Sequence, residues 1–292
     1  MGIEISEAGF SPQMYSAFSD KLRDNLAALR QVLAQPGFGV GPASLGAELE
    51  MYIIDADGRP LSVNQQILDA ACDPQLTLEL NRYNLEYNLS AHRLSAGAFD
   101  ATEREILDKL AGLRTCAAPL GGRIVTIGIL PTLGPDDFGP GSVSARKRYR
   151  VLADSLRQSR GAQFEVNIDG RDPLRLSMDD VTLEGANTSF QIHYRVAPQD
   201  YAATFNAVQL VTPLVLAISA NSPGLFGHEL WQETRVPLFK QSIDTRIKDR
   251  YRWHQSPRVG FGNGWVREGA FELFAESVLP CPPFFPICGE LL

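Results

Sequence analysis

Three segments of the chain alternate apolar and polar residues with the period of a β-strand. In residues 44–55 this alternation places Glu48 and Glu50 on one face of the predicted strand. The same pattern runs through residues 84–90 and 188–196. In all three segments the other face is apolar, so each strand is predicted to pack that face under helices and to present a row of polar side chains on the opposite side.

Apolar residues three and four positions apart predict four helices between and around these strands. They are expected at about residues 14–35, 102–116, 144–160 and 199–220. Thr102 precedes Glu103 and Glu105, which is typical of a residue that caps a helix N-terminus.

The remaining segments complete one α+β arrangement. Residues 123–130 are predicted to form a buried strand, and residues 131–141 a loop rich in proline and glycine. Residues 161–183 are predicted to form a hairpin that turns at Asp169 and Gly170. Because strands and helices follow one another without a shift in composition, a single domain is expected over the whole chain, residues 1–292.

Glu48 and Glu50 form an acidic row on the first predicted strand, and their negative charges need to be compensated. Residues two apart on a strand lie roughly 7 Å apart on one face, so Glu48 and Glu50 repel one another unless water or a cation lies against them. A solvated strand face is one interpretation. If the three strands share a sheet, however, Glu86 and His193 converge on the same place, and such ligands suit Mg2+ or Mn2+ bound together with phosphate oxygens.

Composition and charge exclude several classes of protein. The net charge of -7 argues against a general surface for nucleic acid or anionic membranes. The basic run at residues 146–150 is read either as a solvated first turn of a helix or as a phosphate contact. The longest apolar stretch, residues 210–220, is judged too short to span a bilayer.

Cysteine and histidine usage is consistent with a reduced, cytoplasmic protein. The four cysteines form no regular framework and no closely spaced pair; they are Cys72, Cys116, Cys281 and Cys288. His92, His228 and His254 have no partner at a metal-ligand spacing and are expected to be structural.

The usual glycine-rich phosphate loops are absent from the sequence. Neither the P-loop pattern nor the dinucleotide-binding pattern occurs, so a nucleotide would have to be held through metal ions and arginine side chains.

Short motifs, in a fixed order along the chain, together resemble the type 2 glutamate-cysteine ligase family. They are Gly46-Ala47-Glu48-Leu49-Glu50, Asn84-Leu85-Glu86, the segment from Ala186 to His193, Ala220-Asn221-Ser222-Pro223, and Glu233-Thr234-Arg235. The resemblance implies the glutamine-synthetase-like fold, an antiparallel or mixed sheet with a polar, metal-binding face and helices packed on the other face.

The resemblance also implies a reaction and a set of site residues. These are ATP-dependent activation of a glutamate side-chain carboxylate as an acyl phosphate, followed by attack of an amine such as that of cysteine, as in glutathione biosynthesis. The metal-ligand positions correspond to Glu48, Glu50, Glu79, Glu86 and His193. Arg235 matches an arginine that faces phosphate, and Ser189, Gln191 and Arg235 are assigned to the nucleotide; a structural ion pair is the alternative for Arg235.

The end of the chain departs from the family pattern. Relatives continue with a further strand that bears an arginine and a glutamate, so this domain is expected to lack its C-terminal part, and the apolar residues 284–287 are expected to face water. Two alternatives to a ligase therefore stay open: a catalytically impaired metal- or nucleotide-binding relative, and a metal-dependent phosphate-ester hydrolase. Expected partners are amino acids and ATP, with no nucleic acid or membrane, and a homo-oligomer is possible.

Overall fold

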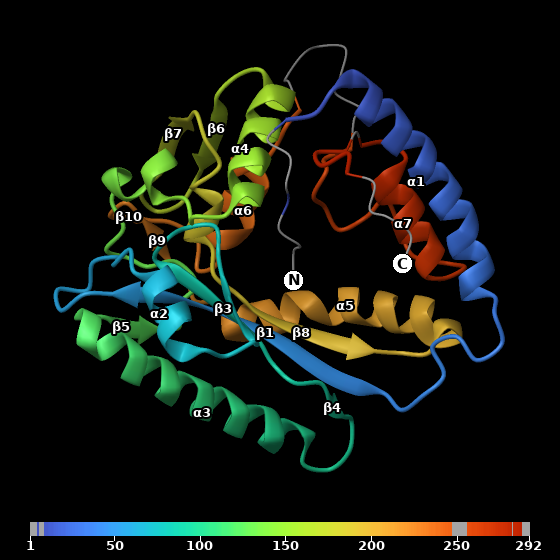
Figure 1. Cartoon of the computed structure of the whole chain (residues 1–292), viewed down its shortest axis with the longest axis horizontal. Helices are drawn as coiled ribbons and strands as arrows, with labels where there is room; N and C mark the ends of the chain where they lie inside the picture. Colours follow the sequence, from blue (N-terminus) through green and yellow to red (C-terminus); the bar gives the residue numbers. More distant parts are fainter. Residues whose placement is uncertain (1–4, 6–8, 247–255, 282, 288–292) are drawn as a thin grey trace.

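The centre of the molecule is an antiparallel six-stranded sheet built around one long strand, β1 (Ser44–Ile54) (Figure 1). The computed structural model describes residues 5, 9–246, 256–281 and 283–287. One edge of β1 pairs with β3 (Asn84–Asn88) and β4 (His92–Arg93), and the other pairs with β8 (Phe190–Arg195) and β5 (Arg123–Val125). A short strand, β2 (Leu76–Leu78), pairs with β3. The three strands predicted to share a sheet therefore lie next to one another in the order β3, β1, β8.

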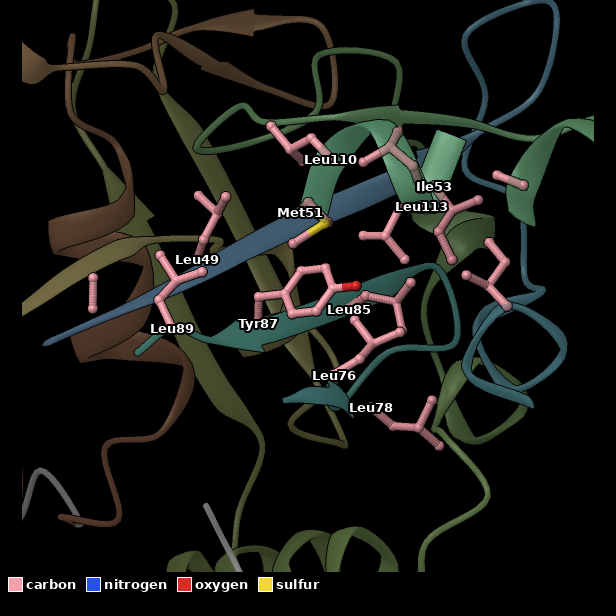
Figure 2. Packing of buried hydrophobic residues seen from close by; sticks show 14 residues of the cluster. Leu49, Met51, Ile53, Leu76, Leu78, Leu85, Tyr87, Leu89, Leu110 and Leu113 are labelled. Atoms are coloured by element: carbon pink, nitrogen blue, oxygen red, sulfur yellow. The ribbon is translucent and has the colours of Figure 1, made fainter. Parts of the chain in front are cut away.

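One face of β1 is packed beneath helices. Leu49, Met51 and Ile53 point into a core that α2 (Asn64–Ala71) and α3 (Ala98–Ala117) cover. Figure 2 shows these side chains meeting leucines of β2, β3 and α3. Full burial of an aliphatic side chain stabilises a fold by roughly 1.5–3 kcal/mol, so this face fixes the orientation of β1 and therefore also the direction of its polar row.

The opposite face of β1 is divided between core and polar residues. Tyr52 and Ile54 belong to a second core, formed with the hairpin of β6 (Phe164–Ile168) and β7 (Leu174–Met178) and with α6 (Arg235–Ser242). Glu48 and Glu50 precede these residues on the same face. The acidic row thus lies beside the second core, on the part of this face where the side chains of β1 are polar.

The 161–183 hairpin and the helix before it form as predicted. The helix α4 (Lys147–Arg160) packs on β6 through Tyr149, Leu156 and Phe164. A further small hairpin, β9 (Gly224–Leu225) with β10 (His228–Glu229), follows later in the chain.

Two local predictions are wrong. The helix α3 begins at Ala98 after Gly97, whose φ is 91°, so Thr102 lies inside the helix and donates to the carbonyl oxygen of Ala98 at 3.1 Å instead of capping it. The strand expected over 123–130 ends at Val125. Beyond it the backbone of Gly128 bonds to Asn221 and to Thr188, which pulls the chain out of the sheet.

The third strand also departs from its prediction. The apolar side chains of β8 are Phe190, Ile192 and Tyr194, and they are 48%, 60% and 46% exposed instead of covered by a helix. The next helix, α5 (Tyr201–Ser219), has no buried residue. Alternation shows which side chains share a face, but not which element covers that face.

The helix α5 belongs to an apolar segment that begins well before residues 210–220, the stretch considered in the sequence. Within the described residues, Pro198–Ser219 is long and apolar enough to cross a membrane by length and composition, so the sequence estimate of the stretch as too short is corrected. Its polar residues tie it to the folded protein: the side chain of Asn206 bonds in both directions with the backbone of Val266, at 2.8 and 3.0 Å. The backbone of Asn221 accepts from Gly128 at 3.0 Å, just beyond the end of the helix.

The outer part of the molecule is a helix pair. The first helix, α1 (Pro12–Leu33), packs against α7 (Ala270–Val278), with the guanidinium of Arg30 4.1 Å from the ring centre of Phe271. Both helices are drawn away from α3, on the other side of the sheet in Figure 1.

The apolar residues 284–287 are not exposed as expected. Phe284 packs against the core beneath α4, with the Arg258 guanidinium 3.8 Å from its ring centre, and Pro286 is buried. The reason is that α4 and β6 leave an apolar surface that Phe284 covers, where the Ser155 hydroxyl also donates to the Phe284 carbonyl oxygen at 3.3 Å. Cys72, Cys116 and Cys281 are free thiols, whereas Cys288 and His254 lie outside the described residues.

Candidate functional site

Three carboxylates meet on the polar face of the sheet. Pairing of β1 with β3 sets Glu50 directly opposite Glu86, and Glu79 comes from the turn that follows β2. Ligand oxygens of these three residues lie within 4.8 Å of one another. Carboxylates at this spacing match the donor set that a hard divalent cation takes in proteins.

A second pair lies beside this cluster. His193 of β8 is in register with Gly46, and its Nε2 lies 3.6 Å from Oε1 of Glu48. A cavity of about 350 Å3 opens here, lined in part by Glu48, Asn88, His193 and Arg195. The five residues predicted as metal ligands thus lie in two adjacent groups, Glu50 with Glu79 and Glu86, and Glu48 with His193.

Burial alters the charge of Glu50. Loss of water contact raises its pKa to about 7, the hydrogen bond from Ser189 opposes this rise, and the charge of Glu86 adds to it. The Ser189 backbone N–H donates to Oε2 at 2.7 Å, and the Gln191 amide donates to Oε1 at 3.4 Å. Both residues predicted to bind nucleotide therefore orient Glu50 here; contact with a nucleotide stays a prediction.

The surroundings of Glu79 also disfavour its charged form. Burial raises its pKa well above the usual range, and the charges of Glu50 and Glu86 raise it further. Without a cation the cluster therefore retains protons near neutral pH. A divalent cation would supply the positive charge that these protons provide.

The donor chemistry around the cluster fits Mg2+ or Mn2+. Its donors are carboxylate oxygens, with one imidazole nearby and none of the described cysteines among them. One more oxygen on this face, Oδ1 of Asn84, is buried and accepts no hydrogen bond within the described part of the chain. Asn84 lies on the same face of β3 as Glu86, two residues away.

Glu184 is an acidic residue that the sequence analysis did not consider and whose charge acts on that of Glu50. It opens a short 3-10 turn, Glu184–Ala186, and burial raises the pKa of its carboxyl group to about 7, with the charge of Glu50 adding to the effect. It lies in a loop without periodicity, so no face could be assigned to it. The available signal was its place just before the strand that carries His193.

Arg235 lies close to the site but is already engaged in an ion pair. Its Nε and Nη2 both contact the carboxylate of Glu233, the latter at 2.8 Å, and its Nη1 donates to the carbonyl oxygen of Thr188 at 2.6 Å. Ser222 donates to the same carboxylate at 2.6 Å. This geometry matches the structural alternative for Arg235, and contact with phosphate stays a prediction.

The other candidate groups are used by the fold. Nε2 of His92 lies 3.1 Å from Oε2 of Glu105, and Nδ1 of His228 lies 3.3 Å from Oδ2 of Asp172. Both histidines therefore have polar partners.

The basic run at residues 146–150 opens α4 near the acidic cluster. The Tyr149 hydroxyl accepts from Arg148 at 2.8 Å and donates to the Leu78 carbonyl at 2.7 Å, next to Glu79. At these two positions the run is packed against the sheet instead of standing as a solvated turn.

One family model matches most of the chain. The family model described as Glutamate-cysteine ligase family 2 (GCS2) matches residues 44–257, a range that contains both groups of candidate ligands. A search of curated proteins found no match.

Proposed function

Because this chain belongs to glutamate-cysteine ligase family 2, we propose that it is an ATP-dependent carboxylate-amine ligase that uses Mg2+ or Mn2+. Family membership makes it a ligase-type protein with small-molecule substrates. The finer proposal is that it joins the γ-carboxylate of glutamate to an amine such as that of cysteine through an acyl phosphate. A glutamine-synthetase-like sheet, one catalytic domain, a cytoplasmic location and a role in glutathione biosynthesis belong to the same proposal.

One observation carries this proposal. Glu50, Glu79 and Glu86 come from three different segments, yet their ligand oxygens converge within 4.8 Å. Such crowding of partly buried carboxylates is unfavourable in a purely structural role, because each charge raises the free energy of its neighbours. It becomes favourable when a divalent cation is bound.

The proposed roles of the residues follow from their positions. Glu50, Glu79 and Glu86 would hold one cation, and Glu48 with His193 would hold another. When bound, such cations neutralise the charge of transferring phosphoryl oxygens. Ser189 and Gln191 fix the orientation of Glu50 through their hydrogen bonds.

The decisive experiment is ADP release from Mg-ATP by the purified 1–292 chain. ADP should appear only when glutamate and an amine are both supplied, and Glu50→Gln should reduce the rate by a factor of about a hundred or more. Glu103→Gln on the exposed surface of α3 is the matched control for loss of one carboxylate and should retain the rate. Phosphate release that needs no amine would indicate a hydrolase instead.

A specific observation favours a second candidate, a relative that binds metal and nucleotide but turns over slowly. All six residues of β8 are exposed, including His193, so the site is open to water along this strand. Water exclusion strengthens electrostatic interactions in active sites, and an open site lacks this advantage. Mg-ATP binding without ADP release under any combination of amino acids would support this candidate.

A further inference from the structure

The polar face of the sheet changes from acidic to basic along β1. Toward one end, Glu50 of β1 is in register with Glu86 of β3. Toward the other end, Ser44 of β1 is in register with Arg195 of β8 on one side and with Arg93 of β4 on the other. Residues in register on antiparallel strands project from the same face, so the two arginines flank Ser44 on the face that carries the acidic row.

The residue before Arg93 confirms the face to which β4 directs this arginine. Nε2 of His92 lies 3.1 Å from Oε2 of Glu105, on the helix α3 that covers the apolar face of the sheet. Successive residues of a strand project to opposite faces, so Arg93 projects to the polar face. Within the described residues its guanidinium has no hydrogen bond or ion pair.

Arg195 carries a positive charge that no carboxylate neutralises within the described part of the chain. Its Nη2 donates to the backbone carbonyl oxygens of Val40 at 3.2 Å and Gly39 at 3.5 Å. Its Nε and Nη1 make no hydrogen bond among the described residues, so they can donate to a ligand. Arg235 differs in this respect, because its charge is already paired with Glu233.

One cavity connects Arg195 with the candidate cation site. The cavity of about 350 Å3 that is lined by Glu48 and His193 is also lined by Ser44 and Arg195, and its volume suits a small molecule. His193 and Arg195 are two residues apart on one face of β8, or roughly 7 Å along the strand. An acid substrate whose reacting carboxylate lies at the cations can therefore extend along β8 toward Arg195.

We propose that Arg195, with Arg93 across β1 as a second cation, binds the other carboxylate of the acid substrate, so that the site selects dicarboxylic acids. This inference rests on the proposed function, because the cations must hold the reacting carboxylate. A guanidinium presents parallel N–H donors that match the two oxygens of a carboxylate. Because the chain has a net charge of -7, a doubly negative substrate needs such a local positive charge in order to bind.

The test compares ligands that possess or lack the second carboxylate. Titration calorimetry on the full chain, with Mg2+ and a non-hydrolysable ATP analogue present, measures the affinity for glutamate, for glutarate and for 4-aminobutyrate. Glutarate lacks only the amino group of glutamate, and 4-aminobutyrate lacks only its α-carboxylate. Arg195→Gln should weaken binding of glutamate and glutarate about tenfold and leave binding of 4-aminobutyrate unchanged.

Three further variants complete the comparison. Arg195→Lys keeps the charge but loses the planar fork, so its affinity for glutamate should lie between those of wild type and Arg195→Gln. Arg93→Gln should weaken binding of the same two diacids by a smaller factor. The control is Arg104→Gln on the exposed surface of α3, where the guanidinium also donates to a backbone carbonyl oxygen, that of Asp100 at 3.1 Å; all three affinities should be retained.

A structural role for Arg195 would give a different pattern. If its only function is to hold the loop at residues 39–41, Arg195→Gln will lower the Tm and weaken binding of all three ligands equally, and the inference is overturned. Unchanged glutamate affinity in Arg195→Gln overturns it as well.

Failure of the proposed function is recognised separately, from Mn2+ titrations without any acid. If wild type binds Mn2+ and Glu50→Gln weakens this binding, the cation site is present. Absence of glutamate binding to such a wild-type protein would then overturn the carboxylate subsite alone. Absence of Mn2+ binding would instead contradict the proposed function itself.

Discussion

The imidazole of His193 lies beside Glu48, and the residue of β1 in register with His193 is a glycine, Gly46. His193 is in register with Gly46, and its Nε2 lies 3.6 Å from Oε1 of Glu48, two residues further along β1. A Cβ placed on Gly46 would lie 3.8 Å from the Cβ of His193, which is ordinary contact. An alanine therefore fits at position 46 without displacing His193, whereas a longer side chain would have to share the space beside it.

This relationship predicts a size limit at position 46. We expect Gly46→Ala to retain Mn2+ affinity, whereas Gly46→Leu should displace the imidazole and weaken binding severalfold, with the fold retained. Calorimetric titration of both variants measures the effect, and circular dichroism checks the fold. Equal affinities for the alanine and leucine variants would show that His193 does not bind the ion.

The raised pKa values of Glu50 and Glu184, both about 7, predict an unusual pH dependence of stability. Between the ordinary carboxyl pKa near 4.5 and pH 7, the folded state binds more protons than the unfolded state. Stability therefore falls as pH rises through this window. We expect the metal-free chain to melt a few degrees lower at pH 8 than at pH 6.

Thermal unfolding at the two pH values, with and without Mg2+, checks this prediction. Added Mg2+ should reduce the difference, because a bound cation replaces the protons. The double variant Glu50→Gln with Glu184→Gln should also reduce it, since two of the responsible groups no longer titrate. An unchanged difference in the double variant would assign the pH dependence to other groups.

Arg235 and Glu233 form a bidentate ion pair, so Arg235→Lys is expected to destabilise the fold. Lysine keeps the charge but cannot make both contacts of the planar fork, and the loss should be about 1–3 kcal/mol, or several degrees in Tm. A residue that contacts only phosphate would leave the Tm unchanged. Measuring Tm beside the affinity for Mg-ATP and for Mg-ADP separates the two roles.

The exposed apolar side chains of α5 predict binding of a hydrophobic probe. Leu214 and Ile218 lie one turn apart and are 69% and 89% exposed. We expect Leu214→Glu with Ile218→Glu to reduce fluorescence of bound anilinonaphthalene sulfonate and to reduce concentration-dependent association in light scattering. Leu107→Glu, at an exposed leucine of α3 that is 56% exposed, is the control and should change neither.

Alternation along the strands was sufficient to predict which side chains share the polar face. Glu48, Glu50, Glu86 and His193 all lie there, because a period of two is set by local backbone geometry. The register was not predictable: nothing local indicates that Glu50 is opposite Glu86, since this pairing depends on the turns and on core packing.

The errors have a common physical origin. Glu184 was missed because its loop has no period, and its place over the sheet depends on contacts with distant residues such as Asn81 and Tyr52. The exposure of β8 and α5 was likewise invisible, because burial depends on which segments cover a face. The start of α3 was also misplaced, because the Thr102 pattern resembles a helix cap. In the structure the helix begins directly after Gly97, and Thr102 lies inside it.

The pairing of β1 with both β3 and β8 also has a consequence for the order of folding. The partner β3 follows β1 after a short connection, whereas β8 follows only after more than half of the matched region has been made. Closing the longer loop costs more chain entropy, so β1 and β3 are expected to meet first. A folding intermediate would then already hold Glu50 beside Glu86, and a cation that binds there could speed the later docking of β8, which brings His193 to Glu48.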